Sequence, residues 1–143
     1  MKIKRHASAA WQGGLKDGKG TISTESGALT AYPYGFATRF EGVRGTNPEE
    51  IIGAAHASCF TMALSLILGE AGFKATQLDT AAEVTLESVE GGFAITAIKL
   101  TLKGQVPGAD DATFQSLAAK AKAGCPVSKL LKADITLEAT LVP

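Results

Sequence analysis

Residues 46–70 read TNPEEIIGAAHASCFTMALSLILGE, and this stretch decides the fold. Asn47 is a favoured helix N-cap, and Pro48 fits the first helical position, where its missing N–H costs nothing. Glu50 stands three residues after Asn47, the spacing that closes a capping box. From Ile51 onward the residues are apolar or small and leave no wide polar face. We therefore expect one long helix that is buried on nearly all sides and carries Cys59 near its middle.

Length and composition narrow the class of protein. With 143 residues, the chain is expected to form a single domain over residues 1–143. Its 14 basic and 14 acidic residues give a net charge of zero without a basic cluster, which argues against nucleic acid as a partner. The N-terminal residues lack the apolar core of a signal peptide, and the 46–70 helix is interrupted by polar residues and flanked by acids. We expect a cytoplasmic protein with no membrane partner.

The part before the long helix reads as short strands. Residues 2–11 and 20–25 alternate polar and apolar side chains around GGLKDGKG at 13–20, which predicts a β-hairpin. This loop resembles a phosphate-binding loop only in part, because Gly20 replaces the required Ser or Thr and no helix follows. GFATRFEG at 35–42 predicts a further strand, with Arg39 on the face opposite its aromatic residues.

The part after the long helix mixes strands and helices. Residues 77–89 and 93–106 predict two strands joined by a turn at 90–92, and a shift of phase near Ala97 predicts a β-bulge. A helix capped by Asp110 or Asp111 should end at Gly124, followed by a short helix from CPVSKLL at 125–131 and a last strand at 133–142. This order predicts an α+β fold in which antiparallel sheets pack on the long central helix. A helix buried all round needs a second chain, so an intertwined homodimer is our hypothesis.

Two cysteines, Cys59 and Cys125, stand 66 residues apart. In a reducing compartment such a pair is buried and inert, redox-active, or metal-binding. A thiol reacts as its thiolate, which a helix start or a nearby cation stabilises. Cys125 lies at a predicted helix start and is the better placed of the two by local sequence. Cys59 lies in the body of a helix and needs a cation, for which Arg39 is our candidate.

The neighbouring polar residues allow two arrangements. His56, His6 and the two cysteines include every His and Cys of the chain and could bind a metal, although their sequence spacing is wide. We favour no metal and interpret His56 as a hydrogen-bonded interior histidine. Glu49 is free to bind a cation such as Arg39, because the adjacent Glu50 serves the cap. Glu49 and Cys59 are ten residues apart, about 15 Å along a straight helix, so one arginine can hardly touch both within one chain.

Three motifs, TRFEG at 38–42, GTNPEEIIGAAHASCF at 45–60 and AGCPVS at 123–128, resemble the osmotically inducible protein C family, which includes the organic hydroperoxide resistance proteins. The arginine within TRFEG is typical of the osmotically inducible branch. The resemblance implies a thiol peroxidase that reduces organic hydroperoxides, and less readily hydrogen peroxide, as an intertwined α+β homodimer. It also implies a role in the response to osmotic and oxidative stress.

The same resemblance implies a role for each site residue. Cys59 is the peroxidatic thiol and Cys125 the resolving thiol, while Arg39 activates the Cys59 thiolate and Glu49 orients Arg39. This reverses the order of reactivity that local sequence suggests. Oxidised Cys59 would form a disulfide with Cys125, and an external dithiol, of lipoyl type by resemblance, would reduce it without a bound cofactor.

The alternative is a non-enzymatic stress or small-ligand-binding protein with structural cysteines. A general disulfide oxidoreductase is not expected, because the chain lacks a CxxC motif.

Overall fold

The computed structural model describes residues 1–143. Contacts between residues group into two compact units, Met1–Ile51 and Ile52–Pro143, and each unit is described by itself. The long helix begins in the first unit and continues into the second. The expectation of a single domain over the whole chain stays a prediction.

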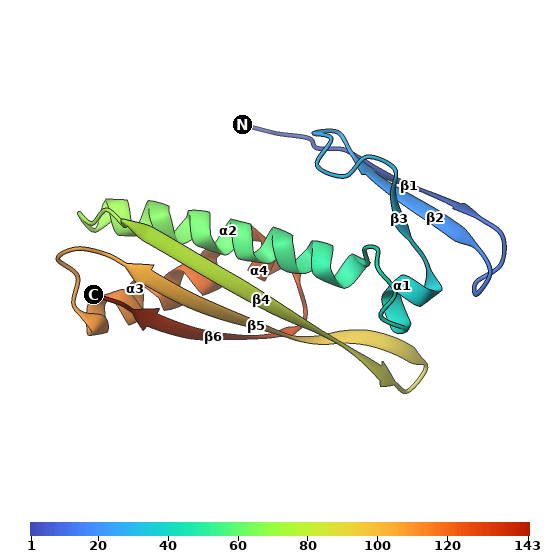
Figure 1. Ribbon diagram of the computed structural model, residues 1–143. Coiled ribbons are helices and arrows are strands. Elements are labelled where there is room, and N and C mark those ends of the chain that lie inside the picture. Colours follow the sequence, from blue (N-terminus) through green and yellow to red (C-terminus); the bar gives the residue numbers. More distant parts are fainter. The chain divides into compact units, whose positions relative to one another are not determined.

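The N-terminal unit contains a three-stranded antiparallel sheet of β1 (Ala7–Gln12), β2 (Lys19–Thr24) and β3 (Tyr32–Tyr34), in that order (Figure 1). The predicted hairpin around the glycine-rich loop is therefore confirmed. Gly20 lies opposite both Trp11 and Tyr34, whose ring centroids are 5.6 Å apart. A Cβ atom at Gly20 would lie 2.4 Å from the Tyr34 ring, so only glycine fits under these aromatic side chains.

The predicted strand at 35–42 is wrong, because Phe36–Phe40 form the short helix α1. Phe36 and Phe40 are four residues apart, and their ring centroids are 5.0 Å apart, which is the contact that one helical turn produces. The Thr38 hydroxyl accepts a hydrogen bond from the Gly35 N–H at 2.8 Å and lies 2.9 Å from the carbonyl of Thr46. These local contacts override the alternating pattern and place Arg39 in the last turn of a helix.

The long helix α2 spans Pro48–Glu70. Asn47 is its N-cap as predicted, since its side-chain oxygen accepts from the Glu50 N–H at 2.8 Å. The Glu50 carboxylate does not complete the predicted capping box and instead accepts from the Thr46 hydroxyl at 2.6 Å. The start of the helix is therefore held by polar contacts on both sides of Asn47.

The burial of α2 differs from the prediction. Five residues on one face are buried: Gly53, His56, Phe60, Leu64 and Leu68. The opposite face is open, with Met62 at 74% and Leu66 at 65% exposure. By length and composition α2 could cross a membrane, with a mean hydropathy of 1.9, but the same holds for core helices of soluble proteins. The prediction of a helix buried on nearly all sides is thus wrong for one chain alone.

The C-terminal unit contains a second three-stranded sheet, in the order β4 (Gln77–Val89), β5 (Gly92–Gln105) and β6 (Asp134–Leu141). The predicted hairpin of β4 and β5 is confirmed, and so is its bulge: Thr85 pairs with Ala97 and Leu86 with Ile95, which leaves Thr96 unpaired. β5 and β6 are parallel, so the prediction of purely antiparallel sheets is wrong here. The intervening helices α3 (Asp111–Gly124) and α4 (Pro126–Leu130) form a crossover long enough to join parallel strands.

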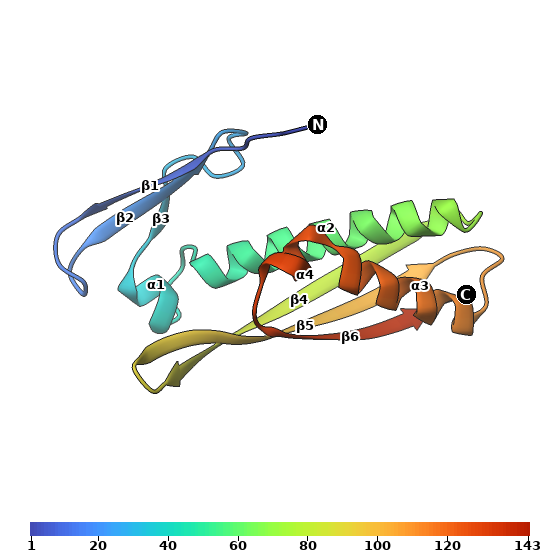
Figure 2. The ribbon, with the colours of Figure 1, turned by 180° about the vertical axis from the view of Figure 1, so that it is seen from behind.

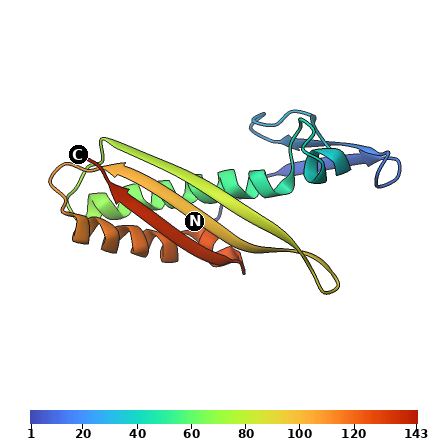
Figure 3. The same cartoon turned by 60° about the horizontal axis from the view of Figure 1, so that its bottom comes forward.

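Helices α2 and α3 cover one face of this sheet, as Figure 3 shows. Between them lies the hydrophobic core of the unit, formed by Phe60, Leu64, Leu68, Ile98, Leu100, Leu102, Val106, Phe114, Ala118, Ala121 and Cys125. The predicted inner face of α3 is therefore confirmed, and Asp110 caps this helix by accepting from the Thr113 N–H at 2.7 Å. The overall α+β fold class predicted from the order of elements is correct.

Gly104 provides a test of this core. A Cβ atom at Gly104 would lie 2.6 Å from the Phe114 ring, which is buried and has no room to move aside. We expect Gly104→Ala to lower the free energy of unfolding by about 1–3 kcal/mol through overpacking. Gly124→Ala is the matched control, because nothing lies within 4 Å of that position and alanine favours a helix. Urea denaturation of both variants measures the difference, and equal stability would contradict the packing described.

Candidate active site

The C-terminal unit brings together the two cysteines of the chain. Cys59 lies on α2 beside the buried stripe, and Cys125 is the residue at which α3 ends and α4 begins. α4 lies against α2 (Figure 2), which is how residues 66 positions apart become neighbours. Both thiols are free, and they lie close enough for each to shift the pKa of the other. Cys125 is fully buried, whereas Cys59 is half-buried.

The surroundings of the two thiols differ in what they do to each pKa. Burial and the hydrogen bond with Cys125 raise the pKa of Cys59, and a backbone N–H of Val127 opposes this only in part. Burial also works against ionisation of Cys125, but hydrogen bonds from Cys59, from the amide and hydroxyl of Ser128 and from Val127 lower its pKa overall. Within this unit the negative charge of the pair therefore belongs on Cys125, in agreement with the local interpretation of the sequence.

His56 is the third polar residue of this cluster. Its side chain is fully buried, its Nε2 lies 2.7 Å from the Ser128 hydroxyl, and its Nδ1 has no partner. Burial lowers the pKa of His56, so the imidazole is neutral at neutral pH. The interpretation of His56 as a hydrogen-bonded interior histidine is confirmed.

The alternative metal site is not assembled. No three His, Cys, Asp or Glu side chains are gathered so that they could hold a metal ion. His6 belongs to the N-terminal unit, where its Nδ1 lies 2.7 Å from the Glu25 carboxylate.

Arg39 and Glu49 form an ion pair within the N-terminal unit. Arg39 Nη2 lies 2.6 Å and Arg39 Nε lies 3.0 Å from the same Glu49 oxygen, and Nε is 3.3 Å from the other oxygen. The Glu49 side chain is 12% exposed and that of Arg39 36%, so the carboxylate is held while one side of the guanidinium remains open. The guanidinium also lies over the Phe40 ring, 5.4 Å from its centroid. Such a pair fixes the orientation of an arginine without satisfying all of its donors. The roles of Arg39, Glu49, Cys59 and Cys125 in a reaction stay predictions.

Sequence reasoning missed Ser128, which contacts both His56 and Cys125. Its position was available in the sequence, because it stands three residues after Cys125 in CPVS, the spacing at which residues of a first helical turn meet the cap. What the sequence lacked was any indication that His56, 72 positions earlier, reaches the same hydroxyl.

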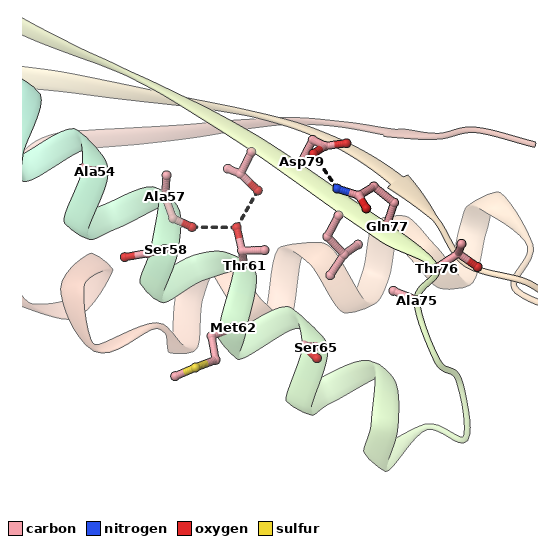
Figure 4. Close-up of a pocket in the computed structure, with 12 residues that line it drawn as sticks. Ala54, Ala57, Ser58, Thr61, Met62, Ser65, Ala75, Thr76, Gln77 and Asp79 are labelled. Carbon is pink, nitrogen blue, oxygen red and sulfur yellow. Dashed lines mark hydrogen bonds between the residues drawn. The ribbon is translucent and has the colours of Figure 1, made fainter.

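A groove of about 680 Å³ runs along the open side of α2, between that helix and the start of β4 (Figure 4). Thr61 lies in this groove and links α2 to β4, since its hydroxyl lies 2.7 Å from the Ala57 carbonyl and 2.7 Å from the Thr80 hydroxyl. The other lining residues of α2 are small or apolar: Ala54, Ala57, Ser58, Met62 and Ser65. Neither cysteine lines this groove, so it is a surface separate from the thiols.

Comparison with known proteins places the chain in a family. The family model described as OsmC-like protein matches residues 40–140. Peroxiredoxin OsmC of Escherichia coli K12 is 62% identical over 138 residues, which cover 96% of each chain. The organic hydroperoxide resistance protein of Xanthomonas axonopodis pv. citri is 33% identical over 101 residues, covering 70% of this chain and 69% of that protein. The chain belongs to the OsmC-like protein family.

A solved structure agrees with this assignment. The crystal structure of the organic hydroperoxide resistance protein OhrB of Bacillus subtilis superposes with a TM-score of 0.68 at 27% identity, and it covers 96% of this chain and 98% of that chain. The α+β architecture described above is therefore that of the organic hydroperoxide resistance proteins.

The neutral, buried His56 predicts a pH dependence of stability. Because its pKa is lower in the folded state than in the unfolded state, the unfolded chain binds more protons as the pH falls below about 6.5. Stability contributed by the neutral form is present above that pH and is lost as the pH falls from about 6.5 toward the lower pKa of His56 in the folded state. We expect His56→Gln to show a shallower decline than the wild type in urea denaturation over this range. A parallel decline for His56→Gln and the wild type would contradict the assignment.

Proposed function

We infer that this protein is a thiol peroxidase that reduces organic hydroperoxides to alcohols. The observation that carries this function is the pair of free, neighbouring thiols of Cys59 and Cys125 in a chain that is 62% identical to a peroxiredoxin. Two thiols in contact can pass between a reduced and a disulfide form without large rearrangement. A non-enzymatic protein with structural cysteines has no need of such contact, so that alternative is not favoured.

We assign the peroxidatic role to Cys59 and the resolving role to Cys125. Cys59 is half-buried and accessible to a small molecule, whereas Cys125 is fully buried and has no access to solvent. Accessibility supports Cys59 as the first thiol to meet a hydroperoxide. Its raised pKa means that Cys59 also needs a cation, since only the thiolate is a good nucleophile.

Arg39 is our proposed source of that cation, from the same chain or from a second copy. The open side of its guanidinium could stabilise both the Cys59 thiolate and the charge that develops on the peroxide oxygens. Glu49 would hold the guanidinium in place through the contacts described above. Arrival of Arg39 would move the negative charge of the thiol pair from Cys125 to Cys59 and so start the reaction.

The chemistry then proceeds in three steps. The Cys59 thiolate attacks the terminal oxygen of the hydroperoxide, the O–O bond breaks, and the leaving alkoxide takes a proton to become the alcohol. Cys59 is now a sulfenic acid, and the Cys125 sulfur attacks it, forming a disulfide and releasing hydroxide that is protonated to water. An external dithiol, which we propose to be of lipoyl type, reduces the disulfide by thiol–disulfide exchange.

Variants of the site test this function. We expect Cys59→Ser to abolish consumption of cumene hydroperoxide with dihydrolipoamide as the reductant. Arg39→Met should lower kcat/KM by about 10²–10³, the loss typical of a removed transition-state donor. Glu49→Gln should cost less, because the arginine remains present but loses its anchor. Arg44→Met is the matched control, an exposed arginine of the same unit. Equal losses for Arg39→Met and Arg44→Met would contradict the assigned role, and an inactive wild type would overturn the function.

We propose that the protein works as a homodimer in the cytoplasm, without nucleic acid or membrane as a partner. The open apolar face of α2 and the groove beside it support a second copy as the covering surface, since apolar faces of this kind mark interfaces. Charged residues of both signs in equal number give no electrostatic reason for binding nucleic acid.

Sedimentation at micromolar concentration tests the dimer. Met62→Glu places a charge on the open face of α2, so it should shift the protein toward monomer. Lys120→Glu, on the exposed part of α3, should leave the sedimentation coefficient unchanged. A wild-type protein that sediments as a monomer would overturn the proposal.

A further inference from the structure

A buried polar chain leads from His56 through Ser128 to Cys125. His56 on α2 and Cys125 before α4 are both fully buried, and Ser128 stands between them. The Ser128 hydroxyl lies 2.7 Å from His56 Nε2, and Ser128 stands in the first turn of α4, three residues after Cys125, whose pKa it lowers. The chemistry proposed above uses Cys125 but gives no role to His56 or Ser128.

The direction of these hydrogen bonds follows from the single proton of the Ser128 hydroxyl. If that proton points to His56 Nε2, the imidazole must carry its own proton on Nδ1, where it is buried and has no acceptor. An orphaned buried N–H is rare and costs about 1–3 kcal/mol. If instead Nε2–H donates to Ser128, the hydroxyl is free to donate to a Cys125 thiolate. This second arrangement satisfies every proton, and it becomes stronger when Cys125 carries the negative charge.

We propose that His56 and Ser128 are positioning residues for the resolving step, and that they hold Cys125 as a thiolate beside Cys59. The proposal rests on the peroxidatic and resolving roles proposed for the two cysteines. In the step itself the Cys125 sulfur forms a bond to the Cys59 sulfur, the S–O bond of the sulfenic acid breaks, and hydroxide leaves and takes a proton to become water.

His56 acts here as a hydrogen-bond donor and not as a base. Its only free nitrogen, Nδ1, is buried without a partner, and burial lowers the pKa of His56, so a buried imidazolium is disfavoured. The titratable groups that act on Cys125 are Cys59 directly and His56 through Ser128. The contribution of His56 is therefore to polarise the Ser128 hydroxyl toward the sulfur.

The first test measures the thiolate of Cys125 alone. In the Cys59→Ser background, thiolate absorbance near 240 nm as a function of pH gives the pKa of Cys125. We expect Ser128→Ala to raise it by about one unit, the effect of losing one hydrogen bond to a charged group. Ser128→Thr, which keeps the hydroxyl, should restore the original value.

Glutamine and asparagine at position 56 test whether the hydrogen bond donated to Ser128 sets the pKa of Cys125, or whether any change at this buried position alters it. His56→Gln places an N–H close to the position of Nε2 and should keep the pKa of Cys125 near its original value. His56→Asn is too short to reach Ser128 and should raise it, as should His56→Leu. Urea denaturation confirms that each variant is folded. If Ser128→Ala and the folded position-56 variants all leave the pKa unchanged, the proposal is wrong. Ser128 is only half-buried, so we expect Ser128→Ala to fold. Its effect on the pKa of Cys125 can therefore be measured even if the position-56 variants unfold.

The second test follows the resolving step with both cysteines present. After one equivalent of cumene hydroperoxide, trapping of the sulfenic acid reports the first step and loss of the second thiol reports disulfide formation. Below the pKa of Cys125, a one-unit rise lowers the thiolate fraction tenfold and raises its nucleophilicity about threefold, so closure should slow about threefold in Ser128→Ala. Formation of the sulfenic acid should not slow, because Ser128 acts on Cys125 and not on Cys59. If the wild type forms no sulfenic acid, the proposed function fails, whereas the titration of Cys125 still decides whether His56 and Ser128 act on it.

Discussion

The contact between the Cys59 and Cys125 thiols is the constraint on which the rest of the site depends. Two neighbouring sulfurs within a buried region cannot both be ionised at low cost, so the pair can hold at most one negative charge. The contact exists because α2 buries one face against the sheet while α4 lies against that helix. The core of the C-terminal unit, with Phe60 and Phe114 fully buried, thus fixes the spacing of two reactive groups.

Sharing one charge gives each group around the thiols a defined task. Ser128 favours the thiolate on Cys125, the sulfur that solvent does not reach, and on our proposal His56 assists it through the Ser128 hydroxyl. On our account, Arg39 favours it on Cys59, the sulfur that a hydroperoxide can reach. The resting enzyme would then store its charge on the protected thiol, and the accessible thiol would become nucleophilic only with Arg39 in place. After oxidation of Cys59, the same surroundings return the charge to Cys125 for closure of the disulfide.

Sequence patterns predicted the elements whose causes are local. The Asn47 cap, the bulge near Ala97 and the helix that begins after Asp110 all follow from residues within a few positions. The strand predicted at 35–42 failed because a contact between two rings, four residues apart, and the Thr38 hydroxyl outweighed alternation. The long helix was expected to be buried all round, but one chain covers only one face of it. The roles assigned to Cys59, Cys125, Arg39 and Glu49 stay predictions. The contact between Ser128 and His56 could not be predicted, because it joins positions 72 apart and leaves no periodic trace in the sequence.

Anaerobic titration of the reduced protein with one equivalent of cumene hydroperoxide, followed by thiol counting and intact mass, tests the central claim most directly. We expect both thiols to disappear together and the mass to fall by two hydrogen atoms, as one Cys59–Cys125 disulfide requires. In Cys125→Ser we expect an oxidised Cys59 that has gained oxygen. Survival of both thiols in a large excess of hydroperoxide would contradict the peroxidase function. Oxidation of Cys125 in Cys59→Ser at the wild-type rate would contradict the division of roles between the two sulfurs.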